Sequence, residues 1–171
     1  MTYTIEEHIP VDFNLLSRVW IYQCNRLFLM SEALEIEVML NDFVDRWQSH
    51  GDKVKGYANL IFGQFLIIMA DETQAGVSGC STDSSVRLVK DIEQKFKVDM
   101  FDRQHLAFIV KQKVQLIPLA QLNYAIQNNF ITTDTIYFNN LVQTKQELLQ
   151  CWLIPVKDSW LIKKIKPLQT A

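Results

Sequence analysis

The chain has 171 residues, of which 49% are hydrophobic and 21% are charged, and 17 basic against 19 acidic side chains give a net charge of −2. This length and composition are typical of a folded globular protein with a sizeable core, and the absence of a basic excess argues against nucleic-acid binding. The longest apolar run, residues 60–70, is broken at Gly63-Gln64 and is shorter than the roughly 20 residues of a membrane span, so no span is expected.

The first quarter of the chain predicts a strand followed by a long helix. Residues 18–24 are rich in β-branched and aromatic side chains, which favours a strand. Ser31 is a candidate helix cap, and Gly51 follows the expected helix end near Ser49 as a stop signal. The buried face of this helix is predicted from apolar residues at helical spacing: Ile36, Met39, Leu40, Phe43, Val44 and Trp47.

Two strands, a loop, a helix and another strand follow. Residues 57–62 and 65–70 predict strands, and the Gly63-Gln64 connection suits a type II′ hairpin turn. A helix is expected from about Asp83 to Phe96 and a strand at 106–110. The order β-α-β-β-α-β predicts an α+β fold with a split βαβ, or ferredoxin-like, N-terminal part and a mainly antiparallel sheet.

The remaining residues predict a smaller set of elements. These are a strand at 114–117, a helix from Pro118 to Asn128, a strand at 135–138, and a helix that begins at a capping box of Thr144 and Glu147. No low-complexity linker divides the chain. We therefore expect a single domain of residues 1–171, in which an α/β C-terminal extension, residues 111–171, packs on the part formed by residues 1–110.

The cysteines and the N-terminus indicate a cytoplasmic location. Cys24, Cys80 and Cys151 are odd in number and widely spaced, which suits neither a disulfide framework nor a CxxC metal site. Reduced thiols are the simplest interpretation. The N-terminal stretch MTYTIEEHIP is acidic and lacks the apolar core of a signal peptide.

Several catalytic motifs are absent from the sequence. No glycine begins a P-loop ending in GK[ST], so ATP hydrolysis by that mechanism is excluded. The histidines are isolated, without an HExxH zinc motif, and there is no GxSxG nucleophile motif. We expect no metal and no cofactor.

The stretch SGCSTDSS, residues 78–85, is the most unusual polar segment. Ser78, Ser81 and Ser84 beside the start of a helix could bind a small anion, and Cys80 there could have a lowered thiol pKa. Asp83 argues against this, because a capping carboxylate would occupy the helix amides and repel an anion. We favour the interpretation as a polar loop with a helix cap.

The expected topology brings further polar residues to the same place. Arg18, His50, Asp71 and Glu72 would lie with Cys80 along one edge of the sheet, beside the N-terminus of the second helix. A functional interpretation pairs Arg18 with Asp71 and uses His50 for proton transfer and Cys80 as a nucleophile. A structural ion pair, a helix-ending histidine and a small buried thiol are the interpretation that we favour.

The stretches RVWIYQCNR, WQSHG, FLIIMADE, SGCSTDSS and MFDR resemble a family of small, uncharacterised bacterial proteins over most of the chain. Some members of that family carry the label ABC transporter ATPase, whereas this chain lacks the residues that such chemistry requires. The resemblance implies a bacterial cytoplasmic protein and no particular activity.

Two functional hypotheses follow from the sequence. The leading one is a non-enzymatic cytoplasmic binding or interaction module with a protein partner of unknown identity. The alternative is a thiol-dependent enzyme or a binder of small, phosphate-type anions that uses the loop at residues 78–85.

Overall fold

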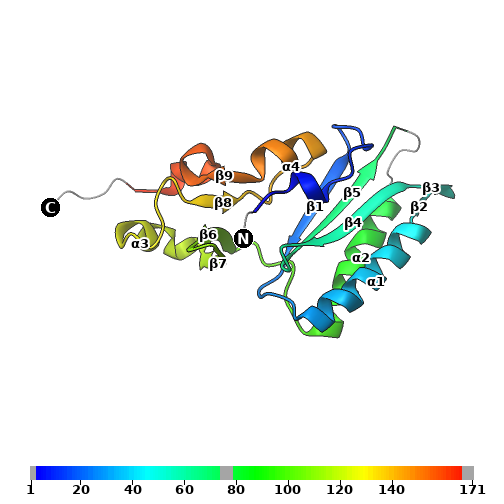
Figure 1. The fold of residues 1–171 in the computed structure, drawn as a ribbon, viewed down its shortest axis with the longest axis horizontal. Helices are drawn as coiled ribbons and strands as arrows, with labels where there is room; N and C mark the ends of the chain where they lie inside the picture. Colours follow the sequence, from blue (N-terminus) through cyan, green and yellow to red (C-terminus); the bar gives the residue numbers. More distant parts are fainter. Residues whose placement is uncertain (1–2, 74–78, 167–171) are drawn as a thin grey trace. The chain divides into compact units, whose positions relative to one another are not determined.

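The computed structural model describes residues 3–73 and 79–166, with the backbone alone described at 79–81 (Figure 1). The chain forms two compact units. We call the described part of 3–101 together with 140–149 the N-terminal unit, and 102–139 with 150–166 the C-terminal unit. Helices and antiparallel sheets occur together, which confirms the α+β class.

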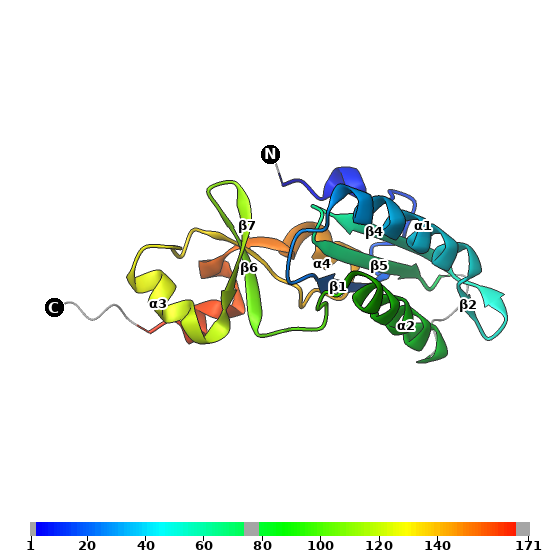
Figure 2. The same cartoon turned by 90° about the horizontal axis from the view of Figure 1, so that it is seen from below.

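The N-terminal unit is a three-stranded antiparallel sheet with two helices on one face (Figure 2). The strand order is β1-β5-β4, and a short hairpin of β2 and β3 precedes β4. Its elements are β1 (Arg18–Gln23), α1 (Met30–Arg46), β2 (Gln48–Ser49), β3 (Asp52–Lys53), β4 (Lys55–Ile61), β5 (Phe65–Asp71) and α2 (Gly79–Phe96).

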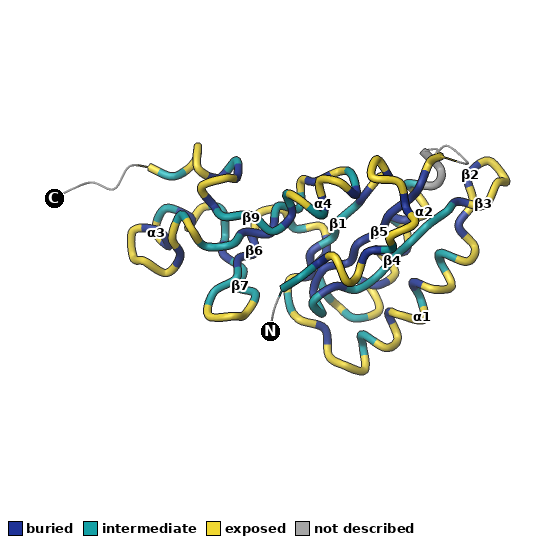
Figure 3. The backbone as a smooth tube through the Cα atoms, turned by 45° about the horizontal axis from the view of Figure 1, so that its top comes forward, coloured by how far each residue is buried: buried dark blue, intermediate teal, exposed yellow. Residues whose placement is uncertain are grey.

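The core of this unit lies between the sheet and the two helices. Every residue of the central strand β5 is buried, and Figure 3 shows the strand as a continuous buried segment. Ile36, Leu40 and Trp47 of the predicted α1 face are buried against the sheet, with Val89 and Ile92 of α2 beside them. The predicted amphipathic faces of both helices therefore form the core.

The sheet reproduces only part of the expected ferredoxin-like arrangement. β1 and β4 flank β5 and run antiparallel to it, as in a split βαβ unit. The last strand of the predicted β-α-β-β-α-β unit, β6 (His105–Val110), instead belongs to the other sheet, so the ferredoxin-like arrangement is not confirmed. A later segment around Gln143 covers the outer edge of β1. The Val19 amide donates to the Gln143 carbonyl at 2.9 Å.

The boundaries of α1 differ from the predicted ones. Ser31 lies inside the helix and is not its cap. The Glu32 carboxylate accepts a hydrogen bond from the Leu29 amide at 2.7 Å and so provides the N-terminal cap. The helix ends at Arg46, and Gly51, with φ +89°, lies instead in the turn between β2 and β3.

The hairpin that joins β4 to β5 also differs in its turn. Phe62 and Gly63 have φ of 52° and 64°, and the Gln64 amide donates to the Ile61 carbonyl at 3.2 Å. Positive φ at both central positions is the type I′ pattern, so the predicted type II′ turn at Gly63-Gln64 is wrong. Gln64 is buried, and its side-chain amide is satisfied by donating to the Cys24 carbonyl at 3.0 Å.

The C-terminal unit contains a four-stranded antiparallel sheet of order β7-β6-β8-β9. Strands were predicted at β6, β7 and β8. In residues 140–149, which belong to the N-terminal unit, Thr144 caps α4 as expected, because its hydroxyl accepts from the Glu147 amide at 3.2 Å. The remaining elements in the described part of the chain are β7 (Lys113–Pro118), α3 (Leu122–Gln127), β8 (Ile136–Phe138), α4 (Lys145–Cys151), β9 (Leu153–Pro155) and four short 3-10 helices, Glu6–His8, Leu119–Gln121, Val156–Asp158 and Trp160–Lys164.

The division between the two units does not fall at the expected position. The predicted boundary between residues 110 and 111 lies in the turn of the β6–β7 hairpin, whereas the N-terminal unit ends its first segment at Phe101. Residues 140–149 then return to the N-terminal unit. The description of the whole chain as one domain stays a prediction.

Candidate functional site

Arg18 forms an ion pair at the sheet end, but its partner is not the predicted Asp71. The Arg18 guanidinium lies 3.4 Å from the Glu72 carboxylate and 5.0 Å from the centre of the Trp20 ring. Register explains the difference: Arg18 is opposite Ala70, so Glu72 shares its face of the sheet and Asp71 points to the other face. Both members of the pair are substantially exposed.

Asp71 is buried and its carboxylate is already engaged. It accepts hydrogen bonds from the Asn14 amide at 3.1 Å and from the Thr73 amide and hydroxyl at 3.1 and 2.7 Å, and Lys55 lies 3.5 Å away. Burial raises the pKa of this carboxyl, but these bonds and the Lys55 charge outweigh it and hold the pKa at about 2. Asp71 thus anchors the N-terminal segment to the sheet.

His50 lies in the β2–β3 turn and does not end a helix. It is exposed, has φ 52°, and makes no hydrogen bond or ion pair with any residue that the structure describes. α2 contacts β2, so the start of α2, the β2–β3 hairpin and the end of β5 lie at the same end of the sheet (Figure 1). Proton transfer by His50 stays a prediction.

The loop at residues 78–85 is in large part the first turns of α2. The helix begins at Gly79, so Asp83 lies within it and is not the predicted cap. Asp83 and Ser84 are exposed. Ser78 lies outside the described residues, as do the side chains of Cys80 and Ser81, so the nucleophile and anion hypotheses stay predictions. The described residues contain no cluster of three potential metal-binding side chains.

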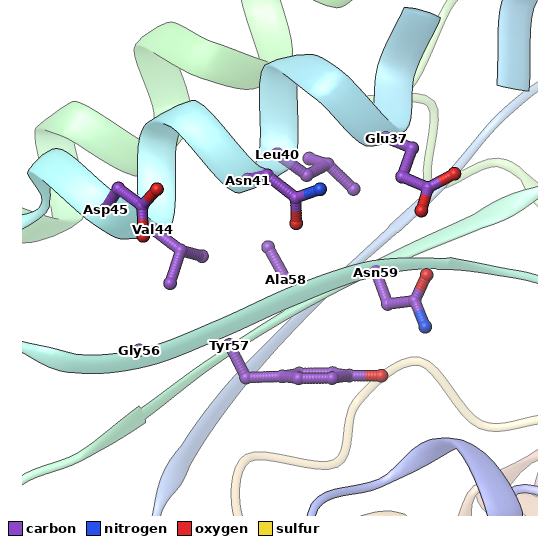
Figure 4. A pocket seen from close by; sticks show the side chains of 9 residues that line it. All are labelled: Glu37, Leu40, Asn41, Val44, Asp45, Gly56, Tyr57, Ala58 and Asn59. Carbon is purple, nitrogen blue, oxygen red and sulfur yellow. The ribbon is translucent and has the colours of Figure 1, made fainter. Parts of the chain in front are cut away.

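A hollow that the sequence did not predict lies between α1 and β4 (Figure 4). Its volume is about 290 Å³, and it is open to solvent on one side. It lies along the outer margin of the sheet and not at the sheet end where the predicted site residues lie. Its lining consists of Glu37, Leu40, Asn41, Val44 and Asp45 from α1 and Gly56, Tyr57, Ala58 and Asn59 from β4.

Small residues on β4 create the hollow. Gly56 and Ala58 occupy two of the positions of β4 that face the helices, and Trp47 packs over Gly56 so closely that a Cβ there would lie 2.5 Å from the indole. Tyr57 points to the opposite face, where its hydroxyl donates to the His8 carbonyl. At these two positions no large side chain therefore fills the space below the outer side of α1.

The hollow adjoins an unpaired strand edge. In the described part of the chain, β5 is the one strand that pairs with β4. The Ile61 carbonyl is bonded within the hairpin, and backbone groups alternate in direction along a strand. The N–H and C=O groups of Gly56, Ala58 and Leu60 consequently face the open edge.

Two carboxylates of the hollow have no ionic partner. Among the described residues, Glu37 and Asp45 form no ion pair, whereas Glu35 of the same helix pairs with Lys95 at 2.8 Å and Asp42 with Arg46 at 2.8 Å. The hollow therefore has an acidic rim.

A signal for this site was present in the sequence. Glu37, Asn41 and Asp45 are spaced by four residues, which places three polar side chains in one row along a helix. Gly56 and Ala58 alternate with larger residues in a strand. Sequence reasoning missed the site because only the fold shows that β4 is at the edge and that this row lies above it.

The chain matches no protein-family model, no curated protein and no solved structure in the comparisons made with it. None of the described helices is both long enough and apolar enough to cross a bilayer.

Proposed function

We propose that the protein is a non-enzymatic binding module that holds an extended segment of a partner polypeptide along β4. The observation that carries this proposal is the unpaired outer edge of β4 beside the hollow under α1. Edge strands with free backbone groups accept an added strand, and pockets beside the edge accommodate alternate side chains of the bound segment.

The two edges of the sheet differ in whether another segment covers them, and this difference supports the proposed function. β1 is covered by residues 143–145, through hydrogen bonds of Val19 with Gln143 and of Lys145 with Ser17. β4 has no such cover among the described residues, and it carries no proline within its edge residues 55–60. Proteins commonly block exposed edges to prevent unwanted pairing, so an edge left open is a candidate for specific pairing.

The size of the hollow favours side chains over a cofactor. Small-molecule sites usually enclose about 300–1,000 Å³ and bury most of their ligand. The hollow, about 290 Å³, is at the lower limit of that range and is open to solvent. It suits one or two side chains of an extended polypeptide.

Exposed apolar residues extend the surface along α1. Met30 and Leu34 are 78% and 58% exposed, and they lie seven and three residues before Glu37 on the same side of the helix. Contiguous exposed apolar side chains often mark contact sites for other proteins. The proposed interface therefore continues from the hollow toward the N-terminus of α1.

The proposal is tested with a phage-displayed library of random 12-residue peptides selected on the immobilised protein. A selected peptide, made synthetically, should slow hydrogen exchange of the Gly56, Ala58 and Leu60 amides, because these amides gain partners in the added strand. The failure to select any peptide, or protection confined to other parts of the chain, would overturn the proposal.

The variant Ala58→Pro tests the backbone contribution directly. Proline removes an N–H that faces the open edge and not one that pairs with β5, so the sheet should keep its pairing. We expect loss of peptide binding, whereas the matched control Ala58→Ser retains both the N–H and binding. Circular dichroism and thermal unfolding verify the fold, and unchanged binding by a folded Ala58→Pro protein would contradict strand addition.

A further inference from the structure

The polar row above the hollow has a defined spacing. Glu37, Asn41 and Asp45 follow one another at four-residue intervals along α1, and Figure 4 shows them above the β4 residues that line the hollow. A helix rises about 1.5 Å per residue, so the two acidic positions are separated by about 12 Å along its axis. The carboxylates therefore mark two points along the β4 edge.

The same distance occurs within an extended peptide. A strand rises about 3.3 Å per residue, so residues four apart are about 13 Å apart, and they project from the same face. Residues three apart would project from opposite faces. A strand added to β4 can thus present two side chains at the spacing of Glu37 and Asp45.

The lack of ionic partners at Glu37 and Asp45 indicates the chemistry of the partner. Neither carboxylate has an ion-pair partner within the described residues, although Glu35 and Asp42 on other sides of α1 do. Unpaired acidic side chains beside a binding edge attract a basic segment and disfavour an acidic one.

We infer, on the basis of the proposed function, that the partner segment is basic and extended, with two lysine or arginine residues four positions apart. These residues bind Glu37 and Asp45, while its backbone pairs with Gly56, Ala58 and Leu60. Asn41 lies between the two carboxylates and is available to the side chain halfway between the basic residues.

The inference is tested with the peptides selected from the 12-residue library. We expect the selected sequences to be enriched in lysine or arginine pairs at four-residue spacing. Replacing either basic residue of a synthetic peptide by glutamine should weaken binding, and moving one of them by a single position should weaken it similarly. Selected peptides without such pairs, or binding indifferent to the spacing, would overturn the inference.

A matched pair of double variants separates local from general charge effects. E37Q/D45N removes the two unpaired carboxylates, and E35Q/D42N removes two carboxylates of the same types from the same helix away from the hollow. We expect about a tenfold loss of affinity for the first and less than about twofold for the second, since exposed ion pairs are individually weak. Equal losses would indicate a net-charge effect and contradict the inference.

The amide measurements separate failure of this inference from failure of the proposed function. Protection of Gly56, Ala58 and Leu60 by peptides that bind E37Q/D45N as tightly as the unmodified protein would support strand addition and overturn the basic partner. Lack of such protection with every peptide would overturn both. Self-association of the protein, seen by light scattering and protecting these same amides, would identify a second copy as the occupant and also overturn the inference.

Discussion

Side-chain alternation along β5 decides which charges meet at the end of the sheet. The sequence predicted that Arg18 would pair there with Asp71, whereas in the structure its partner is Glu72. A shift of one position transfers a side chain to the opposite face. Asp71 therefore holds the N-terminal segment, and Glu72 pairs with Arg18 over the helix-facing side. The pairing register, which sets this outcome, depends on strands distant in sequence.

The variant Asp71→Asn should lower stability in a pH-dependent way. The pKa of Asp71 is about 2 when folded, against an ordinary value near 3.9, so at pH 7 the ionised carboxylate stabilises the fold by about 2–3 kcal/mol. This contribution is present above the unfolded pKa and is lost as pH falls from about 5 through about 2. Urea unfolding at pH 7 and at pH 2 should show a large and then a small difference from the unmodified protein.

A control for this prediction is Glu72→Gln, which removes the neighbouring half-exposed carboxylate. Exposed pairs contribute about 0–1 kcal/mol, so the control should change little. A difference between Asp71→Asn and the unmodified protein that stays constant over the acidic range would contradict the assigned role of the carboxylate.

The contact between Gly56 and Trp47 gives a second prediction at this scale. A methyl group at Gly56 would lie 2.5 Å from the six-membered ring of Trp47, which is 2% exposed and cannot move into solvent. Gly56→Ala should therefore cost about 1–3 kcal/mol of unfolding free energy. In a double-mutant cycle with Trp47→Leu, the cost should fall, because the ring is gone. Equal costs in the two backgrounds would mean that another contact is responsible.

Long amphipathic elements were predictable, and short or non-local ones were not. The apolar spacing of α1 indicated a helix and its buried face, although the cap at Ser31 and the end near Ser49 were wrong. The β2–β3 hairpin has two residues per strand and leaves no periodic signal. The local pattern of β6 indicated a strand but could not specify its sheet, because its partners are β7 and β8.

The N-terminus of α1 depends on a charged cap that the sequence analysis missed. Glu32 accepts from Arg26 at 2.7 and 2.8 Å and from the Leu29 amide, and Arg26 also donates to the Phe96 carbonyl at the end of α2. The hydrogen bonds from Arg26, followed by that from Leu29, lower the pKa of Glu32 to about 2. The cap thus links the ends of two helices.

Glu32→Gln should lower the melting temperature at neutral pH, because it removes the charge from both contacts. The stabilisation by Glu32 is present above its unfolded pKa and is lost as pH falls through about 2, so the variant should lose less stability on acidification than the unmodified protein. Circular dichroism melts at pH 7 and pH 2 provide the measurement. Glu35→Gln, which affects an exposed pair with Lys95, is the matched control, and an equal effect of the two variants would contradict the capping role.

At the scale of the whole molecule, residues 140–149 return to the N-terminal unit and cover only one edge of its sheet. These residues cover β1 through Gln143 and Lys145, while β4 has no equivalent cover in the described part of the chain. The sequence predicted the helix that begins here but not its destination, because such pairing joins residues more than 120 positions apart. The proposed binding edge is thus the edge that this returning segment leaves free.

Lys145→Met tests how the returning segment stabilises the N-terminal unit. The Lys145 ammonium is buried and donates to the carbonyls of Pro10 and Phe13 at 2.7 and 2.8 Å, and to that of Val11 at 3.3 Å. Methionine fills a similar volume but leaves buried acceptors unpaired, at a cost of about 1–3 kcal/mol. Hydrogen exchange should accelerate at the Val19 amide, which the same segment covers, because local stability follows the contacts of each unit.

The C-terminal unit supplies the internal reference for that measurement. Ala107 of β6 is fully buried in that unit, and its amide should exchange at the same rate in the variant and in the unmodified protein. Lys157→Met, which removes an exposed lysine paired with Asp134, should change neither amide. Equal acceleration at Val19 and Ala107 in Lys145→Met would show that both units unfold together, and it would contradict a stabilising role confined to the N-terminal unit.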